Sequence, residues 1–235
     1  MAKKNKEISS SNLIKVKPIT EGQKSVFETW KQGKNQFLFG CAGTGKTFVS
    51  LYLAMQDVLD LKTKYDKVIL VRSLIPTREI GFLPGDEEDK AALYQVPYQN
   101  MVKFMFEQPN EQAFNMLYDR LKNQGSLYFL STSFLRGLTF DNSIIIVDEC
   151  QNLNFHELDT ITTRVGQDSK IIFCGDFSQT DLVKQNEKNG LHDFLRILEE
   201  MQEFNCIEFN IGDIVRSGFV RNYLIQKTKL GMGME

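Results

Sequence analysis

A short glycine-rich segment near the start of the chain has the spacing of a phosphate-binding loop. Residues 40–47 read GCAGTGKT, which fits G-x-x-x-x-G-K-T. The apolar run 37–39 before it predicts a buried strand, and Val49, Leu51 and Leu53 after it predict a helix. Glycines let successive backbone N–H groups converge on a phosphate, and the helix N-terminus adds a favourable dipole. The segment therefore predicts a site for a nucleoside triphosphate.

Two side chains of this loop have separate expected roles. Lys46 provides a positive charge for the β- and γ-phosphates, and the Thr47 hydroxyl is a ligand for Mg²⁺. The other contacts are expected from the backbone of the loop and from the first turn of the helix. The predicted nucleotide-binding residues here are Gly40, Cys41, Ala42, Gly43, Thr44, Gly45, Lys46, Thr47 and Phe48.

Acidic residues end a second apolar segment. Residues 143–147 read SIIIV, and Asp148 and Glu149 follow directly, which is the Walker B pattern. We expect Asp148 to hold Mg²⁺ through water and Glu149 to polarise the attacking water. Charges beside a buried strand need partners, so an incidental surface pair is disfavoured.

A third polar group follows the apolar run 170–174. The sequence continues GDFSQTD from residue 175, and Gln179 is expected to sense the γ-phosphate. Asp176 is expected to orient that phosphate or the attacking water. Loops at the carboxyl ends of strands in an open α/β sheet lie on the ligand side, so these groups should meet.

Gln23 allows two interpretations. With Thr20 it fits a capping box, in which each side chain satisfies a free backbone amide at the start of a helix. Alternatively, its carboxamide reads the adenine edge, because it offers both a donor and an acceptor. The local pattern favours neither.

Several arginines are further candidates. Arg216 is either a γ-phosphate sensor or an ordinary ion-pair partner, and residues 213–217 are expected to open a last helix whose apolar face includes Phe219 and Tyr223. Arg72 ends a predicted strand at 67–72 and Arg78 lies in the loop after it, and both could contact a nucleic-acid backbone or a neighbouring subunit. For Arg78 a solvated loop position is an equal alternative.

Composition places the chain among ordinary globular proteins. It has 235 residues, 42% of them hydrophobic and 25% charged, and a net charge of −2, which gives no overall attraction to nucleic acid. No apolar run has membrane-spanning length, and the four cysteines are scattered. We expect a soluble cytoplasmic protein with no membrane contact.

The sequence predicts three parts: a mobile basic tail over 1–17, one domain over 18–227 and a C-terminal tail over 228–235. The basic tail is either a phosphate-contacting arm or a solvated end.

The order of the motifs resembles the PhoH family of ATPases, which is related to superfamily 1 helicases. The residues that carry the resemblance are GCAGTGKT at 40–47, GFLPGD at 81–86, RGLTF at 136–140, DECQN at 148–152, GDFSQTD at 175–181 and DIVRS at 213–217. Cys150 departs from the alanine that is usual after D-E, with little expected effect. The resemblance implies a single RecA-like α/β domain, with a mostly parallel sheet and helices on both faces. It also implies ATP and Mg²⁺ as cofactors, and a nucleotide site that includes Gln23, Asp148, Glu149, Gln179 and Arg216.

The resemblance further implies ATP hydrolysis, an RNA-directed helicase role and oligomeric rings. We expect an ATPase coupled to RNA or single-stranded DNA that acts as a homo-oligomer, for example a hexameric ring. With one RecA-like domain, a neighbouring subunit would complete the cleft, and Arg216 or Arg136 would then act in trans. The alternative is an ATP-driven oligomeric switch that acts on a protein partner. A small-molecule phosphotransferase is disfavoured, because Glu149 and Gln179 suit the positioning of water.

Overall fold

Six apolar segments form a parallel sheet in the computed structural model, which describes residues 6–73, 87–132, 135, 137–176 and 185–230. The strands are β1 (Asn35–Gly40), β2 (Lys67–Arg72), β3 (Leu127–Ser131), β4 (Ser143–Asp148), β5 (Lys170–Cys174) and β6 (Phe204–Phe209). They lie in the order β3-β2-β4-β5-β1-β6, and every pairing among them is parallel. The strands predicted at 37–39, 67–72, 143–147 and 170–174 are confirmed, as is the single α/β domain with a parallel sheet.

Both faces of the sheet are buried, which explains why its central strands are continuously apolar. Ile144 and Ile146 of β4 pack on one face, and Ile145 and Val147 pack on the other. All four side chains are fully buried. The sheet is therefore the middle layer of three.

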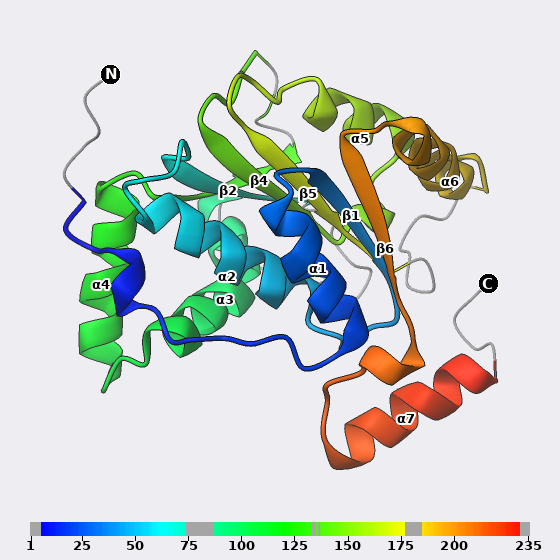
Figure 1. Ribbon diagram of the computed structural model, residues 1–235, viewed down its shortest axis with the longest axis horizontal. Helices are drawn as coiled ribbons and strands as arrows, with labels where there is room; N and C mark the ends of the chain where they lie inside the picture. The colour runs from blue at the N-terminus through cyan, green and yellow to red at the C-terminus, as the bar shows by residue number, and fades with distance from the viewer. Residues whose placement is uncertain (1–5, 74–86, 133–134, 136, 177–184, 231–235) are drawn as a thin grey trace.

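Helices cover the two faces (Figure 1). One face packs against α1 (Glu21–Lys31), α2 (Lys46–Leu59), α3 (Glu87–Phe106) and α4 (Glu111–Asn123), and the other against α5 (Phe155–Thr162) and α6 (Gln185–Glu200). Short 3₁₀ helices form at Ser10–Asn12, Cys150–Asn152 and Ile211–Asp213. Among the described helices none is long and apolar enough to cross a membrane.

The last helix begins later than predicted. Residues 214–217 are not helical, with extended backbone at Ile214 and Ser217, and α7 runs from Gly218 to Lys229 at the edge of the domain (Figure 1). The Val215 N–H donates to the carbonyl of Gly43 at 3.0 Å, so this stretch pairs with the phosphate loop rather than within a helix. The expected apolar face of α7 is also not buried in the domain, because Phe219 is 83% exposed and Tyr223 is 58% exposed.

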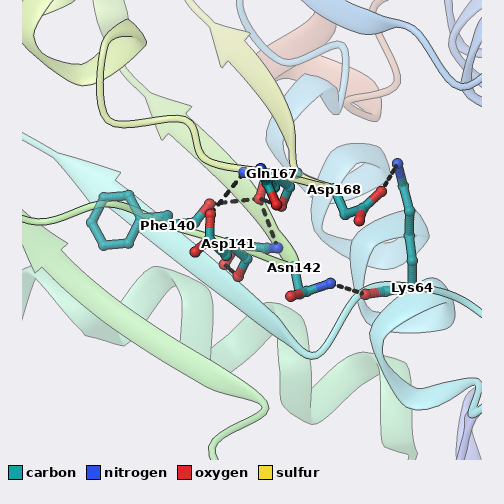
Figure 2. A network of polar contacts seen from close by, with 8 residues as sticks. Lys64, Phe140, Asp141, Asn142, Gln167 and Asp168 are labelled. Atoms are coloured by element: carbon teal, nitrogen blue, oxygen red, sulfur yellow. Dashed lines mark hydrogen bonds and ion pairs between the residues drawn. The ribbon is translucent and has the colours of Figure 1, made fainter. Parts of the chain in front are cut away.

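A polar network fixes the amino ends of three neighbouring strands (Figure 2). The Gln167 N–H donates to the Asp141 carboxylate at 2.7 Å, and the Asn142 N–H donates to the Gln167 carbonyl at 2.9 Å. The Asn142 side chain donates to the Lys64 carbonyl at 3.1 Å, and Lys64 forms an exposed ion pair with Asp168. These residues precede β2, β4 and β5. The network therefore aligns the three strands whose opposite ends carry the polar groups predicted above.

The first described residues pack on the domain, which corrects the expected mobile tail for residues 6–17. Ile8 and Leu13 are only 7% and 9% exposed and belong to the core under α2 and α3. The Ile14 N–H donates to the Met105 carbonyl at 2.9 Å, and the Tyr52 hydroxyl donates to the Ile14 carbonyl at 3.1 Å. The lysines dominate the composition, but apolar residues spaced among them are sufficient to hold the segment in place.

We predict that Leu13→Ala lowers the free energy of unfolding by about 2 kcal/mol, because it removes a buried side chain and leaves a cavity. Leu61→Ala is the matched control, since Leu61 is 45% exposed and its truncation should change stability by less than about 0.5 kcal/mol. Chemical denaturation measures both. Equal stability of the two variants would show that the N-terminal segment does not pack as described.

Candidate active site

The phosphate loop lies between β1 and α2, in the strand–loop–helix context that the sequence predicts. Gly40, Gly43 and Gly45 have φ values of 106°, 71° and 84°, a backbone region that favours glycine. A Cβ on Gly40 would lie 2.1 Å from the carbonyl oxygen of Phe209, and one on Gly43 would lie 2.9 Å from Cγ of Arg216. The first and second glycines are thus required by contacts as well as by backbone conformation.

Lys46 reaches back across the loop. Its Nζ donates to the carbonyls of Gly40 at 2.9 Å and Cys41 at 2.7 Å, and the residue is 9% exposed. Burial lowers the pKa of Lys46, and the nearby Asp176 partly opposes that change. A phosphate in the loop would supply the negative charge that favours the protonated amine.

Thr47 and Asp148 meet, although 101 positions separate them in the chain. The Thr47 hydroxyl donates to Oδ1 of Asp148 at 2.6 Å, which joins the start of α2 to the end of β4. Mg²⁺ prefers oxygen ligands and commonly keeps several waters while it binds one or two protein groups and substrate phosphates. One hydroxyl and one carboxylate beside a phosphate loop fit that requirement.

Glu149 is held in place by Gln151, a residue that the sequence did not identify as part of the site. Gln151 donates from Nε2 to the Glu149 carboxylate at 2.5 Å, and its Oε1 accepts from the Asp176 N–H at 3.0 Å. Gln151 is 2% exposed, and it therefore links the tips of β4 and β5. Burial, then the adjacent Asp148 carboxylate, raises the pKa of Glu149, which makes it a stronger base toward water.

Gln23 lies beside the loop, and both the oxygen and the nitrogen of its carboxamide form hydrogen bonds. Nε2 donates to the Thr44 carbonyl at 3.0 Å, and Oε1 accepts from the Ile19 N–H at 3.0 Å. The Thr20 hydroxyl caps α1 by accepting from the Gln23 N–H, so half of the expected capping box forms. Gln23 ties the start of α1 to the phosphate loop, and both sequence interpretations remain compatible with this position.

The arginines differ in what the structure reports. Arg216 lies beside Gly43 of its own chain and lines the same cavity as the phosphate loop. Arg72, at the end of β2, also lines that cavity, with its guanidinium 5.6 Å from the centre of the Tyr94 ring. Electrostatic attraction also links Arg72 to Asp148 and Glu149. Arg78, Arg136 and Gln179 lie outside the described residues.

These groups line one cavity of about 900 Å³. Its polar part is formed by the phosphate loop, Asp148, Glu149 and Asp176, which come from the carboxyl ends of β1, β4 and β5. Its apolar part lies between the segment before α1 and the helix α3. The apolar lining includes Val16, Ile19, Phe48, Met101 and Phe104. The shape suits a molecule with a charged end and a flat, less polar end.

Comparison with known proteins agrees with this geometry. The family described as PhoH-like protein matches residues 15–226. The chain belongs to the PhoH-like protein family. A PhoH-like protein of Synechocystis is 34% identical over 186 residues, which cover 79% of this chain and 54% of that protein. A PhoH-like protein of Bacillus subtilis is 32% identical over 208 residues, which cover 88% of this chain and 61% of that protein.

This PhoH-like chain spans only about half to three-fifths of the length of those relatives. Among solved structures, the large terminase of a thermophilic bacteriophage matches with a TM-score of 0.51 and 13% identity, over 90% of this chain and 50% of that one. The likeness concerns the fold alone, which is that of a RecA-like α/β domain.

Sequence reasoning overlooked two side chains of the PhoH-like site. Gln151 could have been identified from the sequence, because it lies only two residues after Glu149 and so stays close to the end of β4. Tyr98 had none: it is 1% exposed, it lies within α3, and its hydroxyl donates to Oδ2 of Asp148 at 2.7 Å. Only the fold brings Tyr98 to the Walker B strand.

We predict that Gly40→Ala destabilises the domain by about 3 kcal/mol or more, because an unfavourable φ adds to a backbone clash. Gly33→Ala is a matched control. Gly33 also has a positive φ, 77°, but a Cβ there meets nothing within 4 Å, so only the conformational cost of about 1 kcal/mol remains. Chemical denaturation of both variants measures the difference. Equal losses would contradict the close packing of Gly40 on Phe209.

Proposed function

We propose that this domain hydrolyses ATP with Mg²⁺ and couples hydrolysis to RNA or single-stranded DNA. The observation that carries the proposal is the hydrogen bond between Thr47 and Asp148, with Glu149 next to it. This bond joins a phosphate-binding loop to a carboxylate at the place where the β- and γ-phosphates would lie. A site for binding alone would not require a carboxylate with a raised pKa beside them.

The residues divide the proposed reaction between them. Backbone N–H groups of the loop and Lys46 bind the phosphates, and Thr47 with Asp148 would hold Mg²⁺. When bound, Mg²⁺ neutralises charge on the phosphate oxygens. Glu149 accepts a proton from the attacking water, and Gln151 holds the Glu149 carboxylate in place. We assign γ-phosphate sensing to Gln179 and Arg216, and the position of Arg216 in the cavity of its own chain supports action in cis.

The base of ATP is proposed to lie in the apolar part of the cavity. Phe48 and Phe104 meet edge to face there, with ring centres 5.7 Å apart. Gln23 borders this part, and its Oε1 and Nε2 each have capacity for a further hydrogen bond to an adenine edge. This position supports an adenine-reading role in addition to its structural one.

The helix α7 supports coupling to a single strand. It carries Arg221, Lys227 and Lys229 and no acidic residue, although the whole chain has a net charge of −2. Phe219 and Tyr223 stack at 6.4 Å between ring centres and are exposed. Exposed aromatic rings with basic neighbours bind single strands through stacking and phosphate contacts. The segment before α7 contacts the phosphate loop, which gives a physical route for coupling.

The same exposed apolar surface also fits self-association, and we include a homo-oligomer in the proposal. A neighbouring subunit on α7 would complete the open side of the nucleotide site. The second candidate function is an ATP-driven oligomeric switch that acts on a protein partner. The feature that favours it is the exposed apolar surface of α7 and its C-cap, because Val220 and Leu230 are 48% and 66% exposed.

Two substitutions separate binding from hydrolysis. Lys46→Ala should abolish productive phosphate binding. Glu149→Gln should keep ATP affinity near that of the wild type while hydrolysis falls by at least about 100-fold, a typical contribution of a general base. Equilibrium binding of an ATP analogue and steady-state phosphate release measure the two effects. Equal hydrolysis by Glu149→Gln and the wild type would exclude Glu149 as the base.

Strand coupling is tested by ATP hydrolysis with and without single-stranded RNA or DNA, at low and moderate salt. We expect stimulation that weakens as salt rises, because phosphate contacts release counterions. The double variant Phe219→Ala/Tyr223→Ala should lower the ratio of stimulated to unstimulated rates, whereas Met116→Ala, which truncates an exposed side chain of α4, should not. Robust hydrolysis that neither strand changes would favour the protein-directed switch.

A further inference from the structure

The carboxylate of Asp148 has two hydrogen-bond donors, one on each oxygen. Thr47 donates to Oδ1 at 2.6 Å, and Tyr98 donates to Oδ2 at 2.7 Å. Thr47 belongs to the phosphate loop and has an assigned role. Tyr98 comes from α3, a helix that no motif of the site includes. The second donor therefore needs its own explanation.

Tyr98 is held rigidly from several sides. Its side chain is 1% exposed, and its ring lies 5.7 Å from that of Phe129 on β3, measured between centres. Its hydroxyl lies 2.7 Å from Oδ2 of Asp148 and donates to it, which joins α3 to the end of β4. A buried, packed tyrosine allows Asp148 little freedom to rotate.

The nearby Arg72 does not bind the Asp148 carboxylate in the way that Tyr98 does. Arg72 ends β2 in register with Asp148, so the two residues are adjacent across the sheet. Within the described part of the chain, however, Arg72 forms no ion pair with Asp148. Its guanidinium lies over the Tyr94 ring, and its side chain hydrogen-bonds that of Tyr98, so Arg72 acts on the carboxylate only at longer range. A direct arginine contact would cancel the negative charge that a metal ion needs. A phenol orients the carboxylate and leaves its charge in place.

We propose that Tyr98 is the positioning residue of the metal site: its hydroxyl fixes the rotamer of Asp148, so that Oδ1 faces Thr47 and the phosphate loop. This inference rests on the proposed function, because it presumes that Thr47 and Asp148 hold Mg²⁺ beside ATP. It adds α3 to the elements that control the site. Hydrogen-bond partners of metal-binding carboxylates orient them, and their loss typically costs about 10- to 100-fold in metal affinity or activity.

The position of Tyr98 also gives α3 two contacts with a bound nucleotide complex. Met101 and Phe104, on the same helix, line the apolar part of the cavity where the base is proposed to lie. Tyr98 reaches the carboxylate at the other end.

The test is the affinity of the intact chain for a non-hydrolysable ATP analogue, titrated at a series of Mg²⁺ concentrations and in EDTA. In Tyr98→Phe we expect the Mg²⁺ concentration that half-maximally tightens binding to rise about 10-fold or more, with affinity in EDTA unchanged. Tyr118→Phe is the matched control: it removes a hydroxyl from a buried tyrosine of α4 that does not line the cavity, so it should behave as wild type. Thr47→Ala should lose the Mg²⁺ effect.

Two outcomes would overturn the inference, and they differ. If the wild type and Thr47→Ala behave as expected but Tyr98→Phe matches the wild type, Tyr98 only packs α3, while the proposed function stands. If the analogue binds the wild type equally well with Mg²⁺ and in EDTA, the proposed metal site itself fails, and the role of Tyr98 with it. Thermal melting of each variant in EDTA checks that the fold is kept, and Tyr98→Phe should melt within a few degrees of the wild type.

Discussion

Parallel alignment of the central strands is the constraint on which the site depends. Parallel strands end at the same edge of a sheet, so the phosphate loop after β1 and the acids after β4 and β5 are brought together without any long-range contact being specified between them. The polar network at the opposite edge sets the starting points of β2, β4 and β5, and hence where each strand ends. The hydrogen bond between Thr47 and Asp148 is a consequence of that alignment. A slip of one residue in β4 would turn the Asp148 side chain toward the other face of the sheet.

Two buried lysines illustrate how the two edges of the sheet differ. At the amino edge, Lys170 lies 4.1 Å from the centre of the Trp30 ring and donates to the Trp30 carbonyl, and burial lowers its pKa to about 8. Its partners are an aromatic face and a backbone carbonyl, which complete a structural contact. At the carboxyl edge, Lys46 is bound by loop carbonyls close to Asp176 and Glu149 and opens onto the cavity. The buried Lys170 therefore has a structural role, whereas the buried Lys46 lies where a phosphate would bind.

The sequence predicts the fold and the centre of the site because these depend on short-range order. A buried strand, a glycine loop and a helix are all local, and so is the carboxylate pair that ends β4. The features that the sequence could not predict depend on tertiary contacts. Arg216 was expected in a helix, but it lies in the non-helical segment before α7, where Val215 hydrogen-bonds Gly43. The lysines of the N-terminal segment predict a solvated tail, yet the apolar side chains of Ile8 and Leu13 are buried in the same hydrophobic core as residues of α2 and α3. Tyr98 carries no local signal, since its partner lies 50 positions away.

A structure of the chain with a non-hydrolysable ATP analogue and Mg²⁺ is the most direct test of the account. We predict that the β- and γ-phosphates lie in the loop formed by residues 40–47, and that the metal ion lies about 2.1 Å from the Thr47 hydroxyl, with Asp148 in its immediate surroundings. In that complex Tyr98 should still donate to Oδ2 of Asp148. A nucleotide bound elsewhere, or a metal ion remote from Thr47 and Asp148, would contradict the central claim that the aligned strand ends form an ATP site.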